Sequence, residues 1–155
     1  MKKQIVIESI VTLLVMMFLY ASFSKYFDFG GFQRAMYRQP FPHTFSTILI
    51  AIMPPMEIIV SILLIAGKTR KKGLWGALIL MTLFTAYIAA ILLHFFPKVP
   101  CSCGGVISRL NWQQHLVFNI FFLGLAITGL IIQHKPNDFN DGARPDKNIS
   151  RAKSG

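Results

Sequence analysis

The chain has 155 residues, of which 54% are hydrophobic and only 14% are charged, and its formal net charge is +10. Its mean hydropathy of +0.53 lies far outside the usual balance of a soluble domain and excludes that class. The basic residues lie between apolar runs and in the C-terminal tail, not on an amphipathic face with interleaved aromatics. The positive charge therefore indicates membrane topology and argues against nucleic-acid binding.

Four apolar runs follow one another along the chain. They predict transmembrane helices at about 5–26, 45–66, 74–96 and 112–132. The first run also resembles a signal peptide, but it is longer than a usual signal h-region, so we expect it to remain as a span. Residues 135–155 are polar and basic, which predicts a disordered cytoplasmic tail. The predicted fold class is an all-α membrane protein, with residues 1–134 as a four-transmembrane-helix bundle.

The segment between the first two runs, 28–44, is too long for a tight turn. Phe29, Phe32 and Met36 recur in it at roughly helical spacing and are separated by polar side chains. This pattern predicts a short interfacial helix in the first outer loop. An anchor at the membrane surface and a functional lid both fit the pattern.

Basic residues at the ends of the runs predict the orientation of the bundle. One side carries eleven of them: Lys2, Lys3, Lys68, Arg70, Lys71, Lys72, Lys135, Arg144, Lys147, Arg151 and Lys153. The other side carries five: Lys25, Arg34, Arg38, Lys98 and Arg109. The positive-inside rule therefore predicts that both termini are cytoplasmic, and that the loop before the fourth run faces an oxidising compartment where disulfides persist.

That loop contains both cysteines of the chain, Cys101 and Cys103, in a turn-forming sequence from Pro100 to Gly105. Cysteines two positions apart in a turn have Cα atoms about 6 Å apart, which a disulfide tolerates. Such a small ring stabilises little by loop entropy, and a strained, exposed disulfide is easily reduced. The spacing therefore favours redox activity of this pair, while an inert pair and a metal site remain open.

The metal alternative combines the two thiolates with His94 and His115, at the outer ends of the third and fourth runs. Two sulfurs and two imidazoles suit zinc or copper. A histidine near a helix end also lies commonly at the lipid interface or caps a carbonyl group. Spacing alone does not bring these four side chains together.

Other polar side chains could support the cysteine pair. Glu57 lies deep in the second run and should face the bundle interior, for proton handling, a polar contact to a quinone or a packing hydrogen bond. Lys25, at the outer end of the first run, either snorkels to the interface or favours a nearby thiolate. His115 and Asn119 are four residues apart and share a helix face, so they could line a pocket in which His115 relays protons.

The assembled pattern resembles the MauE/DoxX family of redox-associated membrane proteins, and the MauE branch in particular. The resemblance extends from about Ile5 to Ile132. Its carriers are Ser24-Lys25 with Asp28-Phe29, then Pro54-Pro55-Met56-Glu57, and then Cys101-Ser102-Cys103-Gly104-Gly105. The last element is the most specific, because MauE-like proteins show a Cys-x-Cys-x-Gly element in that place.

The resemblance implies a four-helix bundle in the bacterial inner membrane that works with a periplasmic thioredoxin-like protein. MauE and its partner mature a disulfide-rich amine dehydrogenase, but the resemblance does not carry that substrate over to this chain. A weaker likeness in architecture to DsbB and the vitamin K epoxide reductases is an analogy. Those enzymes relay electrons through two cysteine pairs, whereas this chain has one.

The sequence thus predicts thiol-disulfide exchange at Cys101 and Cys103. Electrons would pass directly between this pair and a candidate membrane quinone near His94, His115 and Glu57, or stop at the partner protein. A non-enzymatic membrane adaptor or assembly factor with structural cysteines is one alternative. Copper or zinc handling at the cysteine and histidine cluster is another.

Overall fold

The structure is a computed structural model, and it describes residues 2–93, 95 and 112–134. This part of the chain is all helical. Its helices are α1 (Lys2–Phe27), α2 (Phe29–Tyr37), α3 (His43–Ile65), α4 (Arg70–Leu92) and α5 (Trp112–His134). All except α2 are long and apolar enough to cross a membrane, which confirms the predicted fold class. The cysteine loop and the predicted tail lie outside the described residues.

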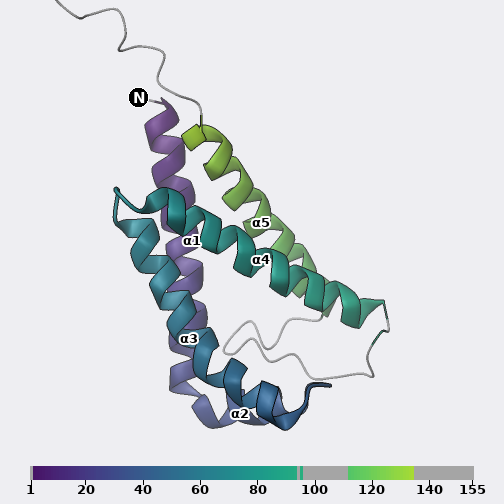
Figure 1. Cartoon of the computed structure of the whole chain (residues 1–155). Coiled ribbons are helices and arrows are strands. Elements are labelled where there is room, and N and C mark those ends of the chain that lie inside the picture. Colours follow the sequence, from purple (N-terminus) through teal and green to yellow (C-terminus); the bar gives the residue numbers. More distant parts are fainter. Residues whose placement is uncertain (1, 94, 96–111, 135–155) are drawn as a thin grey trace, which may run out of the picture.

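The four long helices alternate in direction (Figure 1). Helix α1 packs against α3 and α5, and α4 packs against α5 and α3. The beginning of α1, the turn between α3 and α4, and the last turn of α5 lie toward the same end of the bundle. An ion pair of 2.8 Å between Arg70 Nη1 and Glu8 Oε1 links the start of α4 to α1 at this end.

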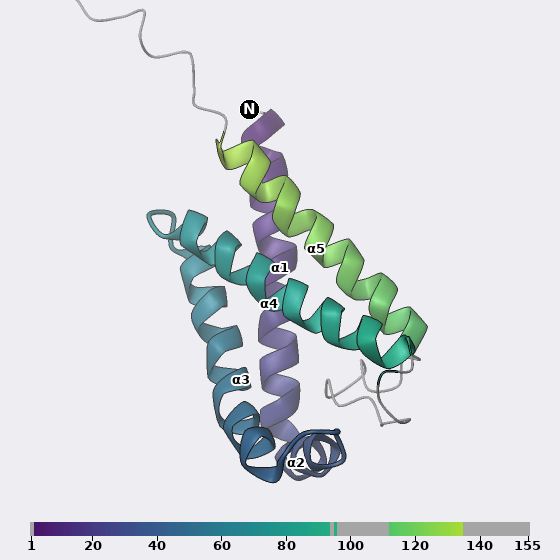
Figure 2. The same ribbon diagram turned by 45° about the vertical axis from the view of Figure 1, so that its right-hand side comes forward.

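Helix α4 begins in the basic segment before the third apolar run, because the chain turns within only a few residues. Thr69 precedes the helix, and its carbonyl oxygen accepts a hydrogen bond of 3.0 Å from the backbone N–H of Gly73. Gly73 allows α3 and α4 to approach closely: a Cβ atom there would lie 2.6 Å from the backbone nitrogen of Leu64. From this contact α4 runs obliquely and diverges from α3 toward its C-terminal end (Figures 1 and 2).

A short helix forms in the segment where the spacing of Phe29, Phe32 and Met36 predicts one. The side chain of Asp28 caps α2 by accepting a hydrogen bond of 2.9 Å from the backbone N–H of Gly31. Phe32 and Met36 are buried and pack with Ile50 of α3, so one face of α2 belongs to the bundle. Its location at the membrane interface stays a prediction.

The main hydrophobic core lies where α1, α3, α4 and α5 meet. It includes Leu14, Phe18, Leu64, Leu74, Ala77, Phe122 and Ala126. Many other large apolar side chains are exposed on the outside of the bundle, as expected for helices that face lipid. The core therefore holds the four long helices together, and α4 separates from α3 beyond it (Figure 2).

Candidate functional site

A cavity of about 440 Å³ lies in the half of the bundle where α4 has diverged from α3. Each of the five helices contributes side chains to its walls. Most of these are apolar, including Met17, Phe18, Met53, Met81, Phe84 and Phe118. The polar members are Lys25, Gln39, Glu57, Tyr87, His115 and Asn119. A mainly apolar cavity of this size with a few polar groups is typical of a small-molecule site.

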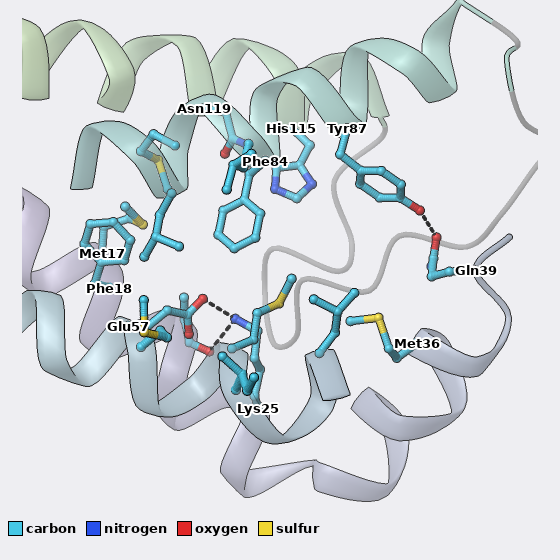
Figure 3. A pocket seen from close by; sticks show the side chains of 18 of the residues that line it. Met17, Phe18, Lys25, Met36, Gln39, Glu57, Phe84, Tyr87, His115 and Asn119 are labelled. Atoms are coloured by element: carbon cyan, nitrogen blue, oxygen red, sulfur yellow. Dashed lines mark hydrogen bonds and ion pairs between the residues drawn. The ribbon is translucent and has the colours of Figure 1, made fainter. Parts of the chain in front are cut away.

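A buried ion pair between α1 and α3 forms one wall of the cavity (Figure 3). Lys25 Nζ lies 2.6 Å from Glu57 Oε1, and the two residues are only 3% and 1% exposed. Lys25 Nζ also donates to the backbone oxygen of Ala21 at 3.3 Å and lies 5.9 Å from the ring centroid of Phe32. Opposite charges in contact reduce the cost of placing either one inside the bundle.

Close contact between α1 and α3 holds this ion pair in register. One helical turn before Lys25, the hydroxyl of Ser22 donates a buried hydrogen bond of 3.0 Å to the backbone oxygen of Pro54. One turn after Glu57, Ser61 donates to the Glu57 backbone oxygen at 2.9 Å. A small residue such as Ser22 allows two membrane helices to approach closely. The two helices therefore present Lys25 and Glu57 to each other and to the cavity.

The opposite wall carries polar side chains from α5. His115 and Asn119 are buried, and Figure 3 shows them across the cavity from Lys25 and Glu57. Asn119 Nδ2 and Glu57 Oε2 are both buried and have no hydrogen-bond partner among the described residues. One atom is a donor and the other an acceptor, so the cavity presents complementary unpaired groups.

Two polar residues of this site, Gln39 and Tyr87, are not predicted by any sequence pattern. The Tyr87 hydroxyl donates to Gln39 Oε1, and Gln39 Nε2 donates to the backbone oxygen of Ala35 at 3.1 Å. These bonds connect the end of α2 to the diverging half of α4 (Figure 3). The sequence offers only two local signs of these residues. Gln39 directly precedes the Pro40-Phe41-Pro42 sequence, and Tyr87 is a polar residue inside an apolar run. Neither sign predicts a contact between distant helices.

The structure brings four predicted site residues to one cavity: Lys25, Glu57, His115 and Asn119. Of the interpretations of Lys25, snorkelling is wrong, because its side chain is buried against Glu57. His94, Cys101 and Cys103 lie outside the described residues, so a contact with a thiolate stays a prediction.

The predicted metal site at the cysteine and histidine cluster stays a prediction. Three of its four candidate ligands, His94, Cys101 and Cys103, lie outside the described residues. Within 2–93, 95 and 112–134, no group of three or more His, Cys, Asp and Glu side chains could hold a metal ion.

Comparison with known proteins assigns the chain to a family. A search of curated proteins and a search of solved structures each found no match. Residues 3–132 match the family described as methylamine utilisation protein MauE. This range extends from the start of α1 almost to the end of α5 and includes every residue that lines the cavity. The chain therefore belongs to the MauE family of proteins.

Proposed function

We propose that this MauE family member is a membrane redox protein. In this proposal Cys101 and Cys103 exchange a disulfide bond with a thioredoxin-like partner outside the cytoplasm, and a quinone carries the electrons within the bilayer. The observation that supports the proposal is the position of the cavity relative to the segment that carries the cysteines. Tyr87, near the end of α4, and His115, near the start of α5, both line the cavity, and the segment that joins these helices carries both cysteines.

The proposed exchange proceeds in two balanced steps. A partner thiolate attacks the Cys101–Cys103 disulfide, a mixed disulfide forms, and the partner's second thiol resolves it, so the partner is oxidised and both cysteines become thiols. The two thiols then pass two electrons and two protons to a quinone, which becomes a hydroquinone while the disulfide re-forms. The reverse sequence oxidises a hydroquinone and supplies reductant to the partner.

The buried polar residues have supporting roles in this proposal. His115 relays protons between the thiols and the quinone, because an imidazole can accept and release protons near neutral pH. Glu57 and Asn119 provide polar contacts to the quinone, and Lys25 holds the Glu57 carboxylate in position through the 2.6 Å ion pair. His94 is a further candidate contact, predicted from the sequence alone.

The proposed orientation places the cavity half of the bundle on the extracytoplasmic side. The opposite end of the bundle has basic residues at the start of α1 and around the turn between α3 and α4: Lys2, Lys3, Lys68, Arg70, Lys71 and Lys72. At the cavity end the basic residues of α2 and its C-cap are Arg34 and Arg38. The greater positive charge of the former end supports its cytoplasmic location in the bacterial inner membrane.

Alkylation trapping in intact cells tests the exchange. A maleimide reagent that adds mass to each free thiol should reveal an oxidised and a reduced form of the parent protein, and their ratio should change when the partner is deleted. In a Cys101→Ser variant the Cys103 thiolate can attack the disulfide of the oxidised partner, and no neighbouring thiol resolves the product, so a mixed disulfide with the partner should accumulate. Ser102→Ala is the matched control, because it keeps both sulfurs and should retain both redox forms. Cysteines that stay in one state under every condition, with full function in Cys101→Ser, would contradict the exchange.

A further inference from the structure

Two buried atoms on opposite walls of the cavity have hydrogen-bonding capacity that the described part of the protein does not use. Glu57 Oε2 is an acceptor, and Asn119 Nδ2 is a donor; neither has a partner among the residues that the structure describes. Their residues are only 1% and 4% exposed. Buried groups of this kind are unfavourable when unpaired, so a ligand that satisfies both gains affinity at this place.

The remaining walls restrict the chemical class of such a ligand. They carry aromatic and thioether side chains, among them Phe18, Phe84 and Met81, which suit an apolar ring system. The charges of Lys25 and Glu57 already neutralise each other at 2.6 Å. A ligand with its own net charge would be costly to bury beside this pair, so the ligand is uncharged and lipid-soluble.

The oxidised and reduced forms of a quinone differ in the hydrogen bonds that they can form with Glu57 Oε2 and Asn119 Nδ2. The carbonyl oxygens of an oxidised quinone only accept, so they satisfy Asn119 Nδ2 and leave Glu57 Oε2 unpaired. A hydroquinone has hydroxyl groups on opposite sides of its ring, and each hydroxyl both donates and accepts. One hydroxyl can donate to Glu57 Oε2 while the oxygen of the other accepts from Asn119 Nδ2. The two side chains lie on facing walls of the cavity (Figure 3).

We propose that the cavity binds the hydroquinone form of a membrane quinone more tightly than the oxidised form, with Glu57 as hydrogen-bond acceptor and Asn119 as donor. This inference rests on the proposed function for the presence of a quinone, and it adds which redox form the protein favours. Tighter binding of the reduced form raises the reduction potential of the bound quinone, by about 30 mV for each tenfold difference in affinity. The site thereby favours electron flow from the cysteine thiols to the quinone.

Binding measurements without the redox-active thiols test this preference. The full chain with Cys101→Ser and Cys103→Ser is titrated anaerobically in detergent with decylubiquinone and with decylubiquinol, and heat release gives both dissociation constants. One further hydrogen bond to a carboxylate should make decylubiquinol bind about tenfold more tightly. Equal affinities, tighter binding of decylubiquinone, or no binding of either form would overturn the inference. None of these outcomes bears on the exchange reaction of the cysteines, which alkylation trapping tests separately.

Three further variants test whether Glu57 Oε2 and Asn119 Nδ2 cause the tighter binding of decylubiquinol. Asn119→Leu removes the donor and should weaken binding of both forms. Glu57→Gln replaces the unpaired acceptor with an amide that can donate, so it should abolish the preference for decylubiquinol. Ser46→Ala is the matched control, since Ser46 Oγ is also buried without a partner among the described residues but does not line the cavity. If Ser46→Ala weakened binding as much as Asn119→Leu, the assignment of Asn119 would be wrong.

Discussion

The two halves of the bundle differ in how their helices meet. Where α3 turns into α4, the backbones are in contact: Gly73 leaves no room for a Cβ beside Leu64, and a Cβ at Gly129 would lie 3.0 Å from Leu74 Cδ2. In the other half α4 leaves α3 (Figure 2), and side chains from all five helices line a cavity there. Small residues close one half by letting helices approach, whereas polar contacts connect the helices around the open half.

The ion pair of the open half is more deeply buried than the Arg70–Glu8 ion pair of the closed half, in which the Glu8 side chain is exposed. The ion pair of Lys25 with Glu57 and the hydrogen bond of Tyr87 with Gln39 connect helices around the cavity. Burying such groups in a membrane is unfavourable compared with apolar packing. The comparison supports the proposal that the open half retains its polar groups for function, whereas close packing stabilises the closed half.

Breaking the ion pair should have the largest effect on stability. Lys25→Met leaves the Glu57 carboxylate buried without its cation and should lower the free energy of unfolding by about 3 kcal/mol. The double variant Lys25→Met with Glu57→Leu removes both charges and should recover most of this loss. Unfolding by sodium dodecyl sulfate in mixed micelles, followed by circular dichroism, measures both. A single variant as stable as the parent would contradict a structural role of the pair.

A methyl group at Gly73 should disturb the closed half. The new Cβ would meet the Leu64 backbone nitrogen at 2.6 Å, so the helices must separate, and we expect a loss of about 2 kcal/mol in the same unfolding assay. Gly124→Ala is the matched control, because a Cβ there meets nothing within 4 Å. That control should be neutral or stabilising by less than about 1 kcal/mol. Equal losses in the two variants would argue against close packing at Gly73.

Removing the unpaired amide of Asn119 should raise the stability of the protein and weaken its binding of decylubiquinol. Asn119→Leu replaces a buried, unpaired donor by an apolar side chain of similar size, so the ligand-free protein should gain about 1 kcal/mol in stability. The same variant should bind decylubiquinol more weakly. A loss of stability comparable to that of Gly73→Ala would instead make Asn119 part of the structural core.

The smallest effect is expected for the hydrogen bond between α1 and α3. Ser22→Ala removes the donor to the Pro54 backbone oxygen and should cost about 0.6 kcal/mol, the average for side-chain hydrogen bonds between membrane helices. Titration with decylubiquinol should give an unchanged dissociation constant, because Ser22 does not line the cavity. A strong loss of binding would show that register between α1 and α3 controls the site.

The sequence predicted the fold well because transmembrane helices depend on local composition. A run of apolar residues long enough to cross a bilayer must form its backbone hydrogen bonds within itself, so each run gave a helix. The short helix α2 also followed from local spacing, at Phe29, Phe32 and Met36. The start of α4 at Arg70 differs from the beginning of the apolar run, because helix geometry continues through basic residues where hydropathy does not.

The site was predictable only in part, because its contacts join residues far apart in the sequence. Depth in the bilayer singled out Glu57, and helical spacing placed His115 and Asn119 on one face. The pairing of Glu57 with Lys25, 32 positions away, depends on how α1 and α3 are registered, and no local pattern encodes that register. The same holds for Tyr87 and Gln39, which meet only because α4 crosses the bundle obliquely.

Anaerobic reaction of the reduced protein with decylubiquinone tests the coupling of thiols to quinone most directly. The parent protein, with Cys101 and Cys103 as thiols, should form its disulfide as decylubiquinone is reduced, with one quinone consumed per disulfide formed. Asn119→Leu should slow both changes equally, whereas Ser46→Ala should react at the parent rate. Thiols that remain reduced while decylubiquinone is unchanged, or a parent rate in Asn119→Leu, would contradict the coupling.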